Sequence, residues 1–189
     1  MSGPVRRIQV MGQSGSGKST LGLRLAAHLG VPHVELDAIN WLPGWTERPH
    51  EEFRAMLAEQ TAGDDWVVSG NYISRGSDEI LWTRADLLIW LDLPLHVLIR
   101  RQLVRSWHRW RSHELLWGTN YERFLPQLKV WDRDSLVGFT LATRAATRRR
   151  LIEAMGDPRW AHARWVRLTS QREVDAFVTS LLASAEEAA

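Results

Sequence analysis

The stretch Gly12–Thr20, with the sequence GQSGSGKST, decides the fold of this chain. Its glycines, serines and single threonine bury almost no apolar surface, so the stretch does not belong to a core. It satisfies the pattern G-x-x-x-x-G-K-[S/T] and lies between a predicted strand and a predicted helix. Glycines allow successive backbone amides to turn toward one centre, and the following helix adds the positive end of its dipole. The stretch therefore predicts a phosphate-binding loop (P-loop) of the Walker A type.

The P-loop supplies the predicted nucleotide-binding residues. They are Gly12, Ser14, Gly15, Ser16, Gly17, Lys18, Ser19 and Thr20. Lys18 is expected to neutralise the outer phosphates of ATP, and Ser19 to offer its hydroxyl to Mg²⁺. The chain has 22 arginines and two lysines, yet this position holds a lysine. We infer that the site needs a compact ammonium there rather than a planar guanidinium.

Short apolar runs alternate with amphipathic segments along the rest of the chain. Strands are predicted at Val5–Met11, His33–Leu36, Trp66–Gly70, Ala85–Pro94 and Ala163–Leu168. Helices are predicted at Lys18–Leu29, from Pro49 as a first helical position, at Leu95–Trp110, between the polar break Trp117–Asn120 and Met155, and after a capping box of Ser170 and Glu173. Such alternation predicts an α/β protein whose parallel sheet has helices on both faces.

The composition is that of an ordinary globular protein of one domain, residues 1–189, with 44% hydrophobic and 24% charged residues. We expect an acceptor-binding insert at about 38–64 and a helical lid region at about 100–150. The chain has no cysteine, which excludes disulfides, thiolate metal sites and cysteine nucleophiles. No apolar leader or membrane-length run is seen, so we expect a cytoplasmic protein without a membrane partner, either monomeric or homodimeric.

Positive charge is concentrated between residues 100 and 150. This segment holds eleven arginines and Lys129 against four acids, a net charge of +8, while the rest of the chain carries −6. The excess indicates either an anionic partner, nucleic acid or polyphosphate, or a solvated helical face. Arg101, Arg105 and Arg109 recur at i, i+4 and i+8, so they share one helical face. We expect them to form a cationic cover for the nucleotide.

Elimination narrows the class of P-loop protein. The chain has no N-K-x-D guanine signature and no L-S-G-G-Q, and it is short for a motor ATPase. A kinase of a small molecule or a nucleotide remains. Asp37 follows the second predicted strand, at the edge where ligands bind in open α/β sheets. It could contact a metal or an acceptor hydroxyl, or act as a base; the alternative is a turn or capping residue.

Several separated motifs carry a resemblance to a known family. They are LDAINWLPGW (residues 36–45), GNY (70–72), RADLLIWLDLP (84–94), RRQLVR (100–105) and ELLWGTNYE (114–122), together with the P-loop. The chain resembles the bacterial topology modulation proteins, or adenylate-kinase-like ATPases, of the nucleoside-monophosphate-kinase and shikimate-kinase branch. The resemblance implies ATP and Mg²⁺ as cofactors. It also implies a three-layer fold with a five-stranded parallel sheet in the order 2-3-1-4-5 and a helical lid after strand four.

The resemblance also implies roles for individual residues. Asp37 matches the family's aspartate after strand two, and Arg101 and Arg105 match the lid arginines that stack on adenine and touch the transferring phosphates. Acceptor-binding positions are Asp37, Trp41, Asn71, Tyr72, Arg75 and Arg109, with Trp45 beside Trp41 as a further wall or as packing. Glu122 matches a family acid to which we assign no role.

One departure from the family pattern concerns the metal. Relatives end strand three in Asp-Gly, and that aspartate organises Mg²⁺ through water, whereas this chain has Ser69-Gly70. A neutral hydroxyl does not offset the charge of the metal in the same way. We expect Asp37, rather than Asp92, to take over this role beside Ser19.

Two functional hypotheses follow. The first is an ATP- and Mg²⁺-dependent phosphotransferase in which Lys18, Asp37, Arg101 and Arg105 carry catalysis toward an unidentified nucleotide or hydroxyl acceptor. The second is a nucleotide-switched regulator that binds nucleic acid or a protein and transfers phosphate only to water. Steep salt dependence of DNA binding would distinguish the second from the first.

Overall fold

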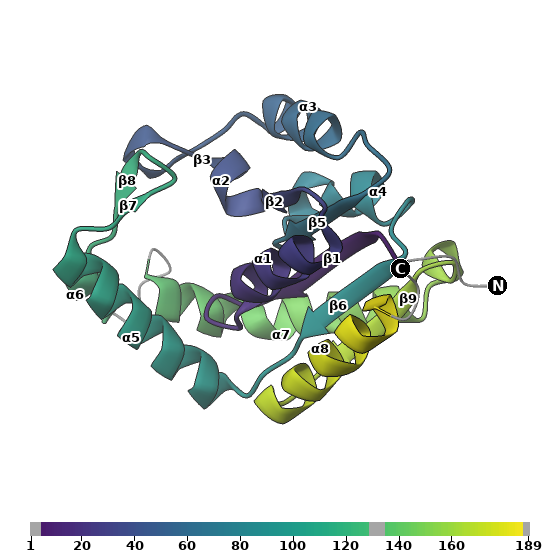
Figure 1. Ribbon diagram of the computed structural model, residues 1–189. Coiled ribbons are helices and arrows are strands. Elements are labelled where there is room, and N and C mark those ends of the chain that lie inside the picture. Colours follow the sequence, from purple (N-terminus) through teal and green to yellow (C-terminus); the bar gives the residue numbers. More distant parts are fainter. Residues whose placement is uncertain (1–4, 129–134, 187–189) are drawn as a thin grey trace.

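The computed structural model describes residues 5–128 and 135–186 and shows a parallel sheet between two layers of helices (Figure 1). The sheet strands are β1 (Arg7–Gly12), β2 (His33–Glu35), β5 (Trp66–Ser69), β6 (Leu87–Leu91) and β9 (Arg164–Leu168). They lie in the order β2-β5-β1-β6-β9, and all their pairings are parallel. Counted among these five strands alone, the order is 2-3-1-4-5. The predicted fold class is confirmed.

The helices follow the strands as predicted, with additional short elements. They are α1 (Lys18–Leu29), α2 (Leu36–Asn40), α3 (His50–Gln60), α4 (Ser77–Leu81), α5 (Leu95–Ser112), α6 (Phe124–Gln127), α7 (Leu136–Met155) and α8 (Gln171–Glu186). Two hairpins stand outside the sheet, β3 (Trp41–Leu42) with β4 (Thr46–Glu47) and β7 (Leu115–Leu116) with β8 (Asn120–Tyr121). Lys129, counted in the basic segment, lies outside the described residues.

Alternating side chains of the strands divide the core into two apolar clusters. In β1, Ile8 and Val10 face a cluster that includes residues of α1 and α8, such as Leu25 and Val178. Met11 faces the other cluster, which residues of α3, α4 and α7 complete. Nearly every side chain of β6 is buried, as a strand covered on both faces requires. The sheet is therefore a rigid platform whose carboxyl ends lie beside the P-loop.

Three local predictions need correction. The second strand ends at Glu35, and Leu36–Asn40 forms a short helix, so Asp37 lies in a first helical turn rather than directly after a strand. Pro49 is the N-cap of α3 and not its first helical residue, because its ψ of 144° is extended. The polar break Trp117–Asn120 is the turn of the β7–β8 hairpin, where Trp117 and Gly118 adopt positive φ.

The last helix begins as predicted, with a modified capping box. Ser170 Oγ accepts a hydrogen bond from the Glu173 N–H at 3.2 Å. The Glu173 carboxylate in turn accepts from the Thr169 N–H at 2.7 Å, one residue earlier than in the usual box. Among the described residues, no helix is both long and apolar enough to cross a membrane.

Candidate nucleotide and acceptor site

The P-loop connects β1 to α1 and keeps several backbone donors free. Gly15 and Gly17 have φ of 78° and 93°, a region that side chains rarely adopt. A Cβ at Gly15 would also lie 2.8 Å from the Leu98 carbonyl oxygen. The N–H groups of both glycines donate to no acceptor among the described residues. Together with the N-terminus of α1, they form a concave set of donors suited to phosphate oxygens.

Lys18, Ser16 and Thr20 complete the loop. Lys18 is half-buried, and its ammonium makes no hydrogen bond or ion pair within the described part of the chain. Ser16 Oγ is buried without a hydrogen-bond partner there, whereas Thr20 is exposed on the first turn of α1. A buried hydroxyl without a partner costs free energy in a folded protein. The loop therefore has both a free cation and an unused donor.

Ser19 has an acidic partner that the sequence prediction missed. Its Oγ donates to Glu35 Oε1 at 2.6 Å, and the other carboxylate oxygen of Glu35 accepts from Trp117 Nε1 at 3.2 Å. Mg²⁺ is usually held by one or two protein oxygens together with substrate phosphates, and a hydroxyl beside a carboxylate fits that pattern. The sequence signal that could have identified Glu35 is the spacing Glu35-x-Asp37, because it places two acids at the end of β2.

Asp37 is held by the tyrosine of the predicted acceptor pocket. Tyr72 donates its hydroxyl to Asp37 Oδ1 at 2.7 Å. Burial, with the neighbouring charge of Asp37, raises the pKa of Tyr72 far above its ordinary value, so this hydroxyl stays protonated and donates. Tyr72 itself adopts a positive φ of 38° after Gly70-Asn71. Asp37 is thus a positioned carboxylate and not merely a turn residue.

Ser69 and Asp92 have partners of other kinds. Ser69 is buried and shares a hydrogen bond of 3.1 Å with His33 Nε2. Burial lowers the pKa of His33, and the charge of Glu35 opposes this only partly. Asp92 binds the guanidinium of Arg167 at 2.5 Å and that of Arg148 at 2.9 Å. The carboxylate of Asp92 is thus engaged in ion pairs with arginines.

Two of the three predicted lid arginines reach the P-loop. Arg105 Nη2 donates to Ser14 Oγ at 2.9 Å, and Arg101 Nη1 approaches the Ser16 carbonyl oxygen at 3.5 Å. Gln102, between them, donates to the Ser14 carbonyl oxygen at 2.7 Å. The guanidinium of Arg101 also binds Gln171 at the start of α8. The face of α5 that Arg101 and Arg105 share through their i, i+4 spacing therefore contacts the P-loop.

Arg105 is the most unusual charge in the site. Its Nε is buried without a hydrogen-bond partner, and no carboxylate lies within ion-pair distance in the described residues. Burial and the charge of Arg109 lower the pKa of Arg105, and the carboxylates of Glu122, Asp37 and Glu35 act in the opposite direction. These acids therefore gather around the guanidinium without pairing with it. An oxyanion bound here would relieve a half-buried charge that lacks an ion-pair partner.

Arg109, the third predicted lid arginine, is neutralised by acids. Its guanidinium lies 3.4 Å from Glu122 Oε2 and 3.5 Å from Glu114 Oε1. This pairing gives Glu122, which is buried, a structural partner. The repulsion among the arginines of this row is thus offset by carboxylates at Arg109, whereas Arg105 has no ion-pair partner among the described residues.

Asn71 and Arg75, both predicted in the acceptor pocket, bind other parts of the chain. The Asn71 amide exchanges two hydrogen bonds with the backbone of Gly12, at 2.9 and 3.1 Å. Arg75 binds Asn40, the carboxylate of Glu47 and a backbone carbonyl, and it stacks over Phe53 at 4.8 Å. Their polar groups hold the P-loop entrance and the α2–β4 segment in place.

A row of tryptophans joins the lid to the α2–β4 segment (Leu36–Glu47). Trp45 packs edge to face on Trp41 and on Trp117, with ring centroids 5.7 and 5.9 Å apart. The side chain of Asn120 accepts from the Trp45 N–H at 3.0 Å and donates to the Leu42 carbonyl oxygen at 3.0 Å. The β7–β8 hairpin accordingly lies beside β3 in Figure 1. We call this contact the lid joint.

Comparisons with known proteins bear on the fold. No protein-family model matches the chain. An uncharacterized protein of Bacillus subtilis, YqaC, is 29% identical over 145 residues, which cover 74% of this chain and 79% of YqaC. The resemblance to topology modulation proteins therefore stays a prediction.

Solved structures of the same architecture carry kinase names. A shikimate kinase from Acinetobacter baumannii in complex with shikimate superposes with a TM-score of 0.56 at 18% identity, covering 96% of this chain and 94% of that one. A shikimate kinase from Bacteroides thetaiotaomicron gives a TM-score of 0.53 at 22% identity, covering 96% and 99%. The chain has the fold of P-loop kinases of this type.

Proposed function

We propose that this protein is an ATP- and Mg²⁺-dependent phosphotransferase that moves the γ-phosphoryl group to a hydroxyl of a small acceptor. The observation that carries the proposal is Arg105, a half-buried guanidinium that touches the P-loop, has a buried Nε without a partner and lacks a paired carboxylate. A site that leaves such a charge uncompensated favours a bound polyphosphate. Lys18 on the same loop adds a second cation without a partner among the described residues.

The proposed roles follow from these contacts. Gly12 to Thr20 hold the phosphates, and Lys18, Arg101 and Arg105 stabilise the charge that develops during transfer. The acceptor oxygen forms a bond to the γ-phosphorus while the bond to the β,γ-bridging oxygen breaks, and the hydroxyl proton passes to Asp37. Ser19 and Glu35 would hold Mg²⁺, which supplies electrostatic stabilisation of the phosphates.

The neighbouring side chains favour a neutral hydroxyl acceptor over a strongly anionic one. The arginines predicted to bind an acceptor anion, Arg75 and Arg109, are both paired with carboxylates. The group available to a substrate in this region is the Asp37 carboxylate, which accepts hydroxyl donors. The indoles of the lid joint, Trp41 among them, provide apolar walls of the kind that sugar rings and aliphatic polyols pack against.

A phosphate-transfer screen tests the proposal. The full chain is incubated with ATP, Mg²⁺ and one acceptor at a time: neutral polyols and sugars, hydroxy acids such as shikimate, or nucleoside monophosphates. Products are read by mass. We expect a phosphorylated neutral acceptor; product from a hydroxy acid or a monophosphate would retain the kinase and overturn the acceptor class.

Lys18→Ala is the first variant to compare. Removing the ammonium should lower transfer at least about a hundredfold, because electrostatic stabilisation of the transferring group contributes several kcal/mol. Circular dichroism should be unchanged, since the Lys18 ammonium makes no hydrogen bond or ion pair among the described residues. Arg24→Ala, on the exposed side of the same helix, is the matched control. Equal turnover of the two variants would contradict the proposal.

The nucleotide-switched regulator remains the second candidate because of the basic segment. Arg100, Arg111, Arg123, Arg149 and Arg150 are its exposed arginines outside the P-loop and Asp92 contacts. If these arginines bind DNA phosphates, the affinity for DNA should fall steeply as salt is raised from about 50 to about 200 mM, because binding releases counterions. Lack of retention on DNA at low salt, with ADP and phosphoacceptor product formed, would exclude this candidate.

A further inference from the structure

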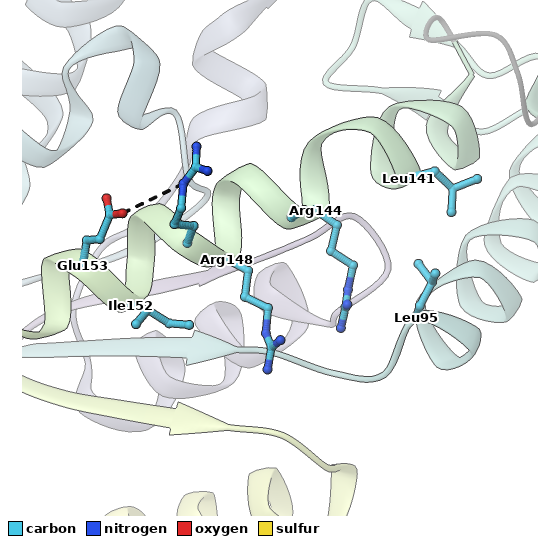
Figure 2. Close-up of a pocket in the computed structure, with 8 residues that line it drawn as sticks. Leu95, Leu141, Arg144, Arg148, Ile152 and Glu153 are labelled. Atoms are coloured by element: carbon cyan, nitrogen blue, oxygen red, sulfur yellow. Dashed lines mark ion pairs between the residues drawn. The ribbon is translucent and has the colours of Figure 1, made fainter.

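A second pocket lies on α7, and none of its lining residues belongs to the P-loop, to the lid arginines or to Asp37. Its volume is about 590 Å³, and it is formed by one face of α7 and the first residue of α5 (Figure 2). Lining residues are Leu95, Leu141, Arg144, Ala145, Arg148, Arg149, Ile152 and Glu153. Pockets of this size, about 300–1,000 Å³, accommodate small organic ligands.

Two arginines of the pocket are fixed by one buried carboxylate. The Asp92 side chain, only 6% exposed, lies 2.9 Å from Arg148 Nε and 3.8 Å from Arg144 Nη2. Arg167 from β9 binds the same carboxylate at 2.5 Å. Three guanidiniums around one carboxylate leave an excess of two positive charges. Figure 2 shows the side chains of Arg144 and Arg148 extended in the same direction from successive turns of α7.

The same arginines keep donors free. Arg148 uses only its Nε, so both of its terminal nitrogens lack a hydrogen-bond partner among the described residues. Arg144 uses only Nη2, which donates to the Leu93 carbonyl oxygen at 3.1 Å. A guanidinium held at one edge by a carboxylate and open at the other is arranged for an incoming carboxylate or phosphate.

Aliphatic side chains flank this charge. Leu141 and Ile152 lie on the same face of α7, 44% and 48% exposed, at opposite ends of the pocket, and Leu95 at the start of α5 lies beside Leu141 (Figure 2). A solvated arginine face needs no such apolar neighbours, and exposed aliphatic groups beside a cationic pair match a ligand with one charged and one apolar end. The charged and the apolar side chains of the pocket therefore both fit an anion carried on an apolar body.

We propose that the α7 pocket binds a small organic anion, a carboxylate or phosphate on an apolar body, separately from the nucleotide site. The carboxylate or phosphate binds the free nitrogens of Arg144 and Arg148, and the body packs on Leu95 and Leu141. Asp92 holds the two guanidiniums in place before the ligand arrives, which lowers the ordering cost of binding.

Titration calorimetry of the full chain with hexanoate and with phenyl phosphate tests this proposal. We expect saturable binding of both probes below about 10 mM, and no saturable binding of the neutral analogues hexanol and phenol, because a charge-assisted bidentate contact supplies most of the affinity of so small a ligand. Hexanoate and phenyl phosphate also separate the two sources of anion, since the site need not bind both equally. No saturation by either anion, or equal binding of anion and neutral analogue, would overturn the proposal.

Variants locate the binding. Arg148→Gln should weaken hexanoate binding at least about tenfold, since one charged hydrogen bond contributes about 1.5–3 kcal/mol. Arg150→Gln, two residues further along the helix and outside the pocket, is the matched control and should bind as the parent does. Leu141→Ser leaves the Asp92 cluster untouched and should also weaken binding, which keeps the test valid if Arg148→Gln misfolds.

The nucleotide site needs its own control, because Gln13 of the P-loop lines a small adjoining cavity with Asp92, Arg144 and Arg148. Lys18→Ala should leave hexanoate binding unchanged. If Lys18→Ala abolishes binding while Arg148→Gln does not, the anion occupies the P-loop and the α7 pocket is not its site. Binding that survives in Lys18→Ala supports the α7 pocket even if no phosphotransfer is found.

Discussion

At the scale of single residues, the acid beside the P-loop hydroxyl comes from β2. Ser69, at the position where the family resemblance led us to expect an aspartate, is hydrogen-bonded to His33. Glu35, one strand away, places its carboxylate on the Ser19 hydroxyl. Because β2 and β5 are paired in register, with Glu35 opposite Ser69, the two positions share one sheet edge. A carboxylate on β2 thus lies beside the position on β5 where an aspartate was expected.

Replacing the Glu35 carboxylate tests whether it serves the metal. Glu35→Gln should raise the Mg²⁺ concentration needed for half-maximal activity by about tenfold to a hundredfold, the usual cost of losing an outer metal partner. The measurement is a Mg²⁺ titration of phosphotransfer at saturating ATP. Glu59→Gln, an exposed change on α3, is the control. An unchanged Mg²⁺ dependence would show that Glu35 does not serve the metal.

His33 predicts a pH dependence of stability. Burial lowers its pKa in the folded protein, so the unfolded chain, with a pKa near 6.5, binds more protons as the pH falls. The free energy of unfolding should therefore decrease as pH falls below about 6.5 and through the folded pKa of His33. Urea unfolding at pH 7.5 and 5.5 should show a smaller loss for His33→Gln than for the parent. His50→Gln, an exposed change, should lose as much as the parent does.

At the scale of elements, the lid joint decides how α5 and the hairpin meet the α2–β4 segment. Its hydrogen bonds join Asn120 to the backbone of Trp45 and Leu42, and Trp45 Nε1 to the Tyr121 carbonyl oxygen at 3.2 Å. Asn120 is 2% exposed, so water does not replace these bonds in the docked state. One asparagine therefore holds two segments that are about 75 residues apart in the chain.

Asn120→Ala should loosen the lid joint. Loss of two interelement hydrogen bonds removes about 1–3 kcal/mol of docking free energy. Amide hydrogens of β7, β8 and residues 41–47 should exchange at least about tenfold faster, while those of β1 stay protected. Hydrogen exchange followed by mass spectrometry measures both regions in one experiment. Arg123→Gln, an exposed change three residues further along, should leave exchange unchanged; equal acceleration in both variants would contradict the role of Asn120.

Elements whose ends are marked by glycine, proline or capping residues could be predicted from the sequence. The bounds of α1 were predicted correctly, because the P-loop glycines and Gly30 mark its two ends. That Arg101 and Arg105 share one face of α5 also follows from their spacing, and in the structure this face contacts the P-loop. The partners of Arg75 and Arg109 could not be predicted, since Glu47 and Glu122 approach them only through the tertiary fold. Glu35 was missed for the same reason: in the sequence it is one polar position of a short strand.

At the scale of the whole molecule, the two apolar clusters share the strands that separate them. β1, β5 and β6 each contribute side chains to both clusters, so neither cluster is complete without the sheet. Much of the basic segment is used inside the fold, on the P-loop, on Glu122 and on Asp92. The uneven charge of the sequence is therefore partly a structural feature rather than an external surface.

The shared sheet predicts that the chain unfolds as one unit. Calorimetric and van 't Hoff enthalpies of thermal unfolding should agree, and circular dichroism and tryptophan fluorescence should report the same midpoint. Addition of Mg²⁺ and a nonhydrolysable ATP analogue should raise that midpoint in the parent and not in Lys18→Ala. Two separate transitions would instead identify the lid region and the sheet as independent units.

The lid joint has a consequence for sequence divergence among relatives. Each of its hydrogen bonds pairs a side chain on one segment with a backbone group on the other, and only Asn120 and Trp45 supply those side chains. Backbone groups are present whatever residue occupies a position. Selection on the hydrogen bonds of the joint therefore falls on these two positions, and selection on its ring packing also falls on Trp41 and Trp117. Homologues that lose one of the pair are expected to lose the other.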